Sequence, residues 1–109
     1  MASRERFVAK QNVENYLCYI GDVTDLTVAA VVSHLLVQEG ARLALYSSPA
    51  DNLERYVEKC NGAIGQLLGR LQDGDHSEQT REMLQRTLKN ITSARDTFKT
   101  ARNGVVEQR

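Results

Sequence analysis

The segment from about residue 24 to residue 46 most constrains the fold, because its side chains are apolar around most of the circumference of a helix. Its polar side chains His34, Gln38 and Arg42 recur every four residues and so form one narrow stripe. Such a helix cannot lie on a surface with a single buried face. It must be the centre of its own domain, or a partner must cover its second side, and the sequence leaves both open.

The rest of the chain also favours long helices. The 109 residues include one proline, the residue that most often interrupts helices, and no useful stretch alternates apolar with polar residues as a half-buried strand would. Apolar residues make up 41% of the chain and charged residues 26%, which is typical of a globular domain with its own core. We therefore predict an all-α fold in a single domain over residues 1–109.

Four helical segments can be placed from the periodicity of the apolar residues. We expect helices at about 3–20, 24–46, 49–72 and 77–103. The third has an apolar seam with spacings of three and four, which is typical of a helix packed against another helix: Leu53, Val57, Cys60, Ile64, Leu67, Leu71. Because only a short turn separates the third and fourth segments, they should form a long antiparallel hairpin within a small bundle of about four helices.

Several helix ends can be predicted from residue type. Asp22 or Thr24 can cap the second helix, and Ser48 followed by Pro49 suits the start of the third. Ser77 should begin the fourth helix. Gly104 should end it. Gly40, inside the second helix, is either a tolerated glycine or a kink that splits the helix.

Gly62, Gly65 and Gly69 form a ridge of small residues on the third helix, beside its apolar seam. Such a ridge allows another backbone to approach closely, from the same chain or from another one. Together with the apolar second helix, it gives the set of residues that we predict as an interaction surface: Val28, Val32, Leu35, Leu36, Leu43, Tyr46, Gly62, Gly65, Gly69.

No arrangement of residues indicates catalysis or metal binding. His34 and His76 are far apart in sequence, and neither follows a glutamate by three residues as the histidines of di-iron bundles do. Cys18 and Cys60 fall in apolar stripes, so we expect small buried side chains, with a disulfide between them as the alternative. We predict no catalytic, cofactor-binding or metal-binding residue and no enzymatic activity.

Basic residues gather near the end of the fourth helix, where Arg95, Lys99 and Arg102 form a candidate basic patch. The whole chain carries 14 basic and 14 acidic residues and no net charge, unlike most nucleic-acid-binding domains. Cations near a helix C-terminus also complement its dipole. Nucleic-acid binding through this patch is therefore an alternative, but not the favoured one.

These observations favour a non-enzymatic protein-protein interaction module of the adaptor, chaperone, immunity or inhibitor type, regulatory and homodimeric, with a protein partner of unknown identity. We expect a cytoplasmic protein, because residues 1–10 lack the apolar core of a signal peptide. We expect no membrane span, because His34, Gln38, Glu39 and Arg42 interrupt the second helix. The remaining alternatives are a nucleic-acid-binding regulator and a bundle that binds a small apolar ligand in a pocket lined by the second helix.

Overall fold

A computed structural model describes residues 2–22, 25–46, 53–74 and 76–107. In these ranges the chain forms four α-helices and no strand: α1 (Ala2–Asp22), α2 (Leu26–Tyr46), α3 (Leu53–Gln72) and α4 (Glu78–Glu107). The prediction of an all-α helical bundle is confirmed.

The helix ends agree with the predictions in part. Ser77 does cap α4, because its Oγ accepts a hydrogen bond from the Thr80 N–H at 3.1 Å. The cap of α2 is neither of the predicted residues but Asp25, whose Oδ1 accepts from the Thr27 N–H at 2.9 Å. The prediction that Gly104 ends the last helix is wrong, since α4 continues to Glu107. The predicted start at Ser48 and Pro49 lies outside the described residues.

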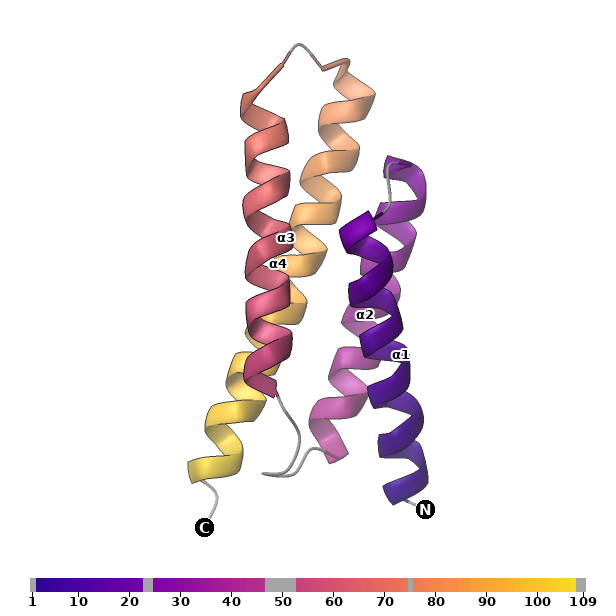
Figure 1. Cartoon of the computed structure of the whole chain (residues 1–109), viewed down its shortest axis with the longest axis vertical. Helices are drawn as coiled ribbons and strands as arrows, with labels where there is room; N and C mark the ends of the chain where they lie inside the picture. Colours follow the sequence, from indigo (N-terminus) through magenta and orange to yellow (C-terminus); the bar gives the residue numbers. More distant parts are fainter. Residues whose placement is uncertain (1, 23–24, 47–52, 75, 108–109) are drawn as a thin grey trace.

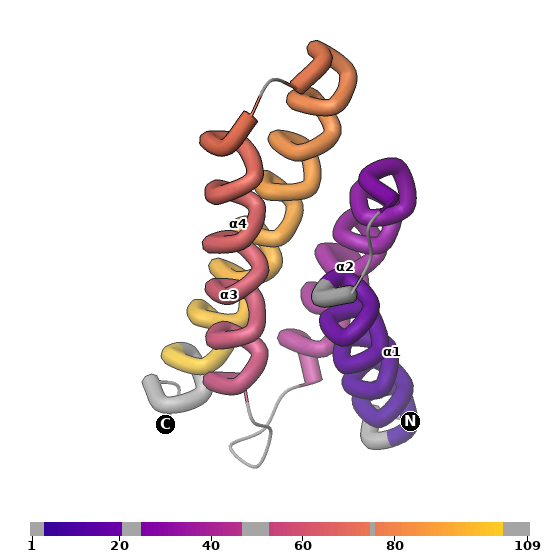
Figure 2. The backbone as a smooth tube through the Cα atoms, turned by 45° about the horizontal axis from the view of Figure 1, so that its top comes forward, coloured from indigo at the N-terminus to yellow at the C-terminus, as the bar shows by residue number. Residues whose placement is uncertain are grey.

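The helices pair as two antiparallel hairpins that lie side by side (Figures 1 and 2). Helices α3 and α4 pack along each other as predicted, and their turn extends beyond the end of the α1–α2 hairpin at the top of Figure 1. The main contact between the hairpins is that of α2 with α4, whereas α1 packs mainly on α2 and touches α3 only lightly. Helix α2 is thus held from two sides, while α1 lies at the edge of the bundle.

One layer of contacts connects all four helices. The Tyr56 hydroxyl of α3 donates a 2.8 Å hydrogen bond to the Glu14 carboxylate of α1. The Tyr56 ring lies 5.5 Å, centroid to centroid, from the ring of Phe98 on α4, and both side chains are fully buried. The Phe98 ring faces Gly40 of α2, where an added Cβ would lie only 3.1 Å from its Cζ atom. Gly40 therefore does not break α2 but makes room for the largest aromatic contact of the core.

A polar link fixes the register of α2 against α4. The side chain of Ser33 is fully buried and donates a 2.9 Å hydrogen bond to the Ala30 carbonyl oxygen. Its Oγ accepts a 3.0 Å hydrogen bond from Asn90 Nδ2 of α4. Since buried polar groups are costly without partners, these bonds favour one alignment of the two helices over a shifted one.

Candidate functional site

The apolar side chains of α2 fall on both its buried and its exposed faces. Its core face packs against α1 and α4 through Ala29, Ala30, Ser33, Leu36, Gly40 and Leu43. On the opposite face the side chains of His34, Gln38 and Arg42 are exposed, as a polar stripe should be. The same face also carries two large apolar residues, Val31 at 56% exposure and Leu45 at 79%. Packing within the chain buries the core face of α2 but leaves the side chains of Val31 and Leu45 exposed.

The predicted interaction residues of α2 divide into two groups. Leu36 and Leu43 are fully buried in the core of the chain itself, so the prediction that they lie on an interaction surface is wrong. Leu36 and Leu43 belong to the core because α2 packs against α1 on one side and against α4 on the other. The other predicted residues of this helix are half-buried and keep part of their surface accessible: Val28, Val32, Leu35, Tyr46.

Two polar pairs give the register of α1 against α2. Asn12 Nδ2 donates a 3.1 Å hydrogen bond to Glu39 Oε1. Seven residues away on each helix, the Tyr46 hydroxyl is hydrogen-bonded to the Glu5 carboxylate, which is the main reason why the pKa of Tyr46 is raised above its ordinary value. In an antiparallel pair with this register, Tyr19 lies opposite Val32.

Large exposed apolar side chains are concentrated on the α1–α2 hairpin. Of the six among the described residues, only Leu68 lies on α3 and none lies on α4. The other five lie on the α1–α2 hairpin, but Phe7 shares the face of α1 with Glu14, which is bonded to α3. The remaining four define what we call the α1–α2 apolar surface: Val8, Tyr19, Val31, Leu45. Sequence analysis did not predict this surface. The available signal was that Val8 and Tyr19 lie off the seam of α1, and that Val31 and Leu45 lie three residues before and three residues after the polar stripe of α2, on the same face of the helix.

The glycine ridge of α3 lies on the solvent side of its helix. A Cβ added at Gly62, Gly65 or Gly69 would meet no heavy atom of another side chain or helix within 4 Å. On a helix with 100° per residue, these glycines lie nearly opposite the buried positions Tyr56 and Cys60. Gly62 lines a cavity that Leu17 and Ile20 of α1 also line, but among the described residues no helix packs against the ridge. The expectation of close packing there is therefore wrong within the chain, and packing by another chain stays a prediction.

The candidate basic patch is largely occupied by contacts between α3 and α4. Arg95 Nη1 donates a 3.2 Å hydrogen bond to Asn61 Oδ1, and its Nη2 lies 3.1 Å from Asp96 Oδ1. Arg102 forms an ion pair with Glu54 of α3. The Lys99 side chain is exposed. Two of the three cations thus stabilise the hairpin, which weakens the nucleic-acid alternative.

The two cysteines have different surroundings. Both are free thiols, and the prediction that both are buried is wrong for Cys18, which is exposed. The buried stripe of α1 runs through Ala9, Val13 and Leu17, and Cys18 is rotated out of it by one residue. Cys60 is fully buried, and this burial raises the pKa of its thiol to about 12.

This difference predicts selective thiol chemistry. In the native protein at pH 8 we expect Cys18 to react with iodoacetamide and Cys60 to remain unmodified, because only thiolates react and Cys60 is both protonated and inaccessible. In guanidinium chloride both thiols should react. Peptide mass spectrometry after quenching checks this result. Equal labelling of the two cysteines in the native state would contradict the packing of α3.

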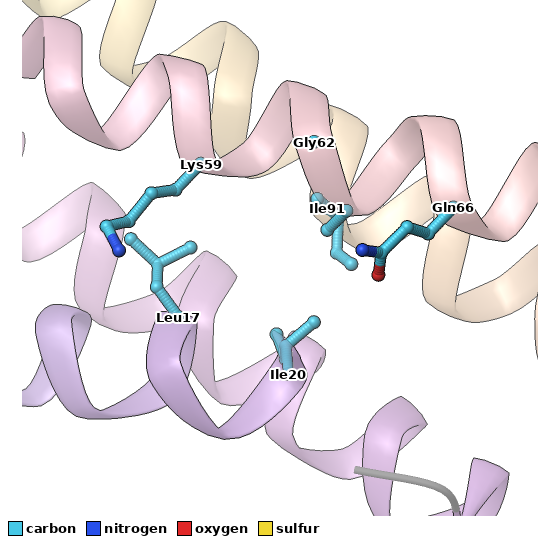
Figure 3. Close-up of a pocket in the computed structure, with 7 residues that line it drawn as sticks. Leu17, Ile20, Lys59, Gly62, Gln66 and Ile91 are labelled. Atoms are coloured by element: carbon cyan, nitrogen blue, oxygen red, sulfur yellow. The ribbon is translucent and has the colours of Figure 1, made fainter. Parts of the chain in front are cut away.

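Two adjoining cavities lie between α1 and α3, and His34 lines neither of them. A cavity of about 180 Å³ is lined by Leu17 and Ile20 of α1, by residues of α3 including Lys59 and Gln66, and by Ile91 of α4 (Figure 3). A smaller one of about 50 Å³ adjoins it, since both are lined by Ile20, Ala63 and Gln66. We call the two together the α1–α3 groove. It exists because α1 packs closely on α2 but only lightly on α3.

Within the described residues, no group of three or more His, Cys, Asp or Glu side chains could hold a metal ion. Helix α2 is long and apolar enough to cross a membrane by length and composition alone. The central helix of a water-soluble bundle meets the same criteria, and the core face of α2 is packed against α1 and α4. No protein-family model matches the chain, and neither the search of curated proteins nor that of solved structures gives a match.

Proposed function

We propose that the chain is a non-enzymatic protein-protein interaction module that self-associates through the α1–α2 apolar surface. The observation that supports this proposal best is the unequal distribution of exposed apolar side chains, five on the α1–α2 hairpin and one on α3. Exposed apolar residues gathered on one side of a small protein often mark a surface that binds another protein. The cytoplasmic location and regulatory role expected from the sequence belong to this proposal.

The distribution of charge supports the same surface. Helix α2 has 21 residues and only two with a full charge, Glu39 and Arg42, whereas the chain as a whole has 28. The cores of protein interfaces are depleted in charged residues and enriched in aromatic and aliphatic ones. The register of α1 and α2 brings Tyr19 next to the half-buried Val28 and Leu35, so the apolar area extends across both helices. With no net charge, two copies also do not repel each other at long range.

Charged substitutions on this surface test the proposal. The double variant Val31→Asp with Leu45→Asp is expected to be monomeric at concentrations where the unmodified protein forms a dimer. Because both side chains are mostly exposed, the free energy of unfolding of the monomer should change by less than about 1 kcal/mol. Sedimentation equilibrium measures the association and chemical denaturation the stability.

Leu68→Asp is the matched control, because Leu68 is also exposed and aliphatic but lies on α3. It should leave the dimer intact. If the purified protein stays monomeric up to high micromolar concentration, the proposed self-association is contradicted. Dissociation by Leu68→Asp but not by the double variant would assign the interface to α3 instead.

A further inference from the structure

We infer that the α1–α3 groove is a binding site for a small aliphatic carboxylate, with the carboxylate beside Arg70 and Thr87 and the hydrocarbon chain between α1 and α3, over Ile91 of α4. This inference is independent of self-association through the α1–α2 apolar surface. The sequence led us to expect a pocket lined by α2 around His34; Leu26 and Ala29 of α2 do line the smaller cavity, but His34 lines neither.

The inner part of the groove contains a polar group without a partner. The side chain of Thr87 on α4 is fully buried, and its hydroxyl makes no hydrogen bond with any group of the described residues. It lines the smaller cavity together with Gln66 and Arg70 of α3. A buried hydroxyl without a partner is unfavourable, so an oxygen atom of a ligand that accepts its hydrogen bond would be stabilised there.

The charged groups around the groove all favour an anion. Arg70 lines the smaller cavity and Lys59 the larger one; both residues are exposed, and neither forms an ion pair with another of the described residues. No acidic side chain among the described residues lines either cavity. A guanidinium, an amide and a hydroxyl in one small cavity are the donors that a carboxylate needs, since it has two oxygens that only accept hydrogen bonds.

The remainder of the groove is apolar and of limited size. Leu17 and Ile20 point from α1 toward α3, with Ile91 of α4 beside them, while Lys59 and Gln66 lie at opposite ends of this cavity (Figure 3). Its volume is about 180 Å³ and it is partly open to solvent, whereas an enclosed aliphatic cavity of about 150 Å³ binds benzene. The volume suits a ligand of about six to ten non-hydrogen atoms, such as a short fatty acid, rather than a long lipid.

Titration with sodium octanoate below its micelle concentration, followed by the amide signals of the ¹⁵N-labelled protein, tests this inference. We expect saturable shifts at Leu17, Ile20, Ala63, Thr87 and Ile91. Arg70→Gln should weaken octanoate binding about tenfold and Thr87→Val about fivefold, the losses expected for one charged and one neutral hydrogen bond. Thr87→Val should not lower the stability, because the hydroxyl that it removes has no partner in the free protein.

Lys89→Gln is the matched control, because it removes an exposed cation from α4 on the side away from the groove. It should leave the affinity for octanoate unchanged. Octyltrimethylammonium has a similar chain but the opposite charge and should not bind. The inference is overturned if octanoate causes no saturable shift or if both amphiphiles bind equally. It is also overturned if dilution of the protein alone moves these signals, since a second copy would then fill the groove.

Discussion

Replacing Leu36 with aspartate is expected to lower the free energy of unfolding by at least about 4 kcal/mol. Leu36 is fully buried on the core face of α2, between the two hairpins. Removal of its side chain alone should cost about 2–5 kcal/mol, and the carboxylate would add the penalty of a buried charge without a partner. The total stability of a domain of this size is about 5–15 kcal/mol, so much of the protein would be unfolded or only marginally folded.

Gln38→Ala is the control for this substitution, because Gln38 lies on the same helix but on its exposed face. Its amide lies 3.4 Å from His34 Nε2, an exposed contact. Loss of the Gln38 amide should change the free energy of unfolding by less than about 0.5 kcal/mol. Circular dichroism during urea denaturation measures both variants. If Leu36→Asp unfolded at the same urea concentration as the unmodified protein, α2 would not be the helix between the two hairpins.

Replacing Gly62, Gly65 and Gly69 together with alanine is expected to raise the free energy of unfolding by about 2–3 kcal/mol. Each glycine lies within α3, where alanine is favoured by about 1 kcal/mol, mainly because glycine loses more backbone entropy on folding. The added methyl groups meet nothing in the chain. This gain is large for two exposed positions and one half-buried position, and it is expected because no helix of the described residues packs against the ridge.

Gly40→Ala should have the opposite sign, although it too replaces a glycine within a helix. Its methyl group would lie 3.1 Å from Phe98 Cζ, and the Phe98 ring cannot move easily because it is fully buried against Tyr56. Overpacking of about 1–3 kcal/mol should outweigh the gain in helix propensity and leave a net loss of about 1 kcal/mol. Urea denaturation compares the two variants. A triple variant that is less stable, or that associates less than the unmodified protein, would mean that another copy packs on the glycine ridge.

The fold could be predicted from sequence because helix periodicity is a strong local signal. The seam of α3 has regular spacings of three and four, and its core positions Leu53, Val57, Cys60 and Leu67 are indeed buried. The short turn after Gln72 brings the two strongest seams together as a hairpin. These features depend only on residues close in sequence.

The positions of the apolar residues of α2 could not be predicted in the same way. A helix that is apolar on most sides gives no angular signal for which residues face α1, which face α4 and which face solvent. Leu36 and Leu43 were therefore predicted to lie on the interaction surface and Val31 and Leu45 were not, although the first two are fully buried and the last two are exposed. The difference arises from the pairing of the two hairpins, a contact between residues far apart in sequence.

The α1–α3 groove could not be predicted either, because it results from the light packing of α1 on α3. Leu17 and Ile20 belong to the apolar seam of α1, and the seam predicts burial whether α3 packs tightly or loosely against it. The structure adds the light packing of α1 on α3 and the unpartnered hydroxyl of Thr87. Thr87 has no signature in the sequence, since most helical threonines are exposed or bond to their own helix.

The most direct test of self-association through the α1–α2 apolar surface is an isotope-filtered nuclear Overhauser experiment on a mixture of labelled and unlabelled protein. Only contacts between two copies give signals in this measurement. We predict intermolecular signals from the methyl groups of Val31 and Leu45 and from the Tyr19 ring. Intermolecular signals that arise instead from Gly62, Gly65 and Leu68 of α3, or no such signals at a concentration where a dimer is present, would contradict this assignment.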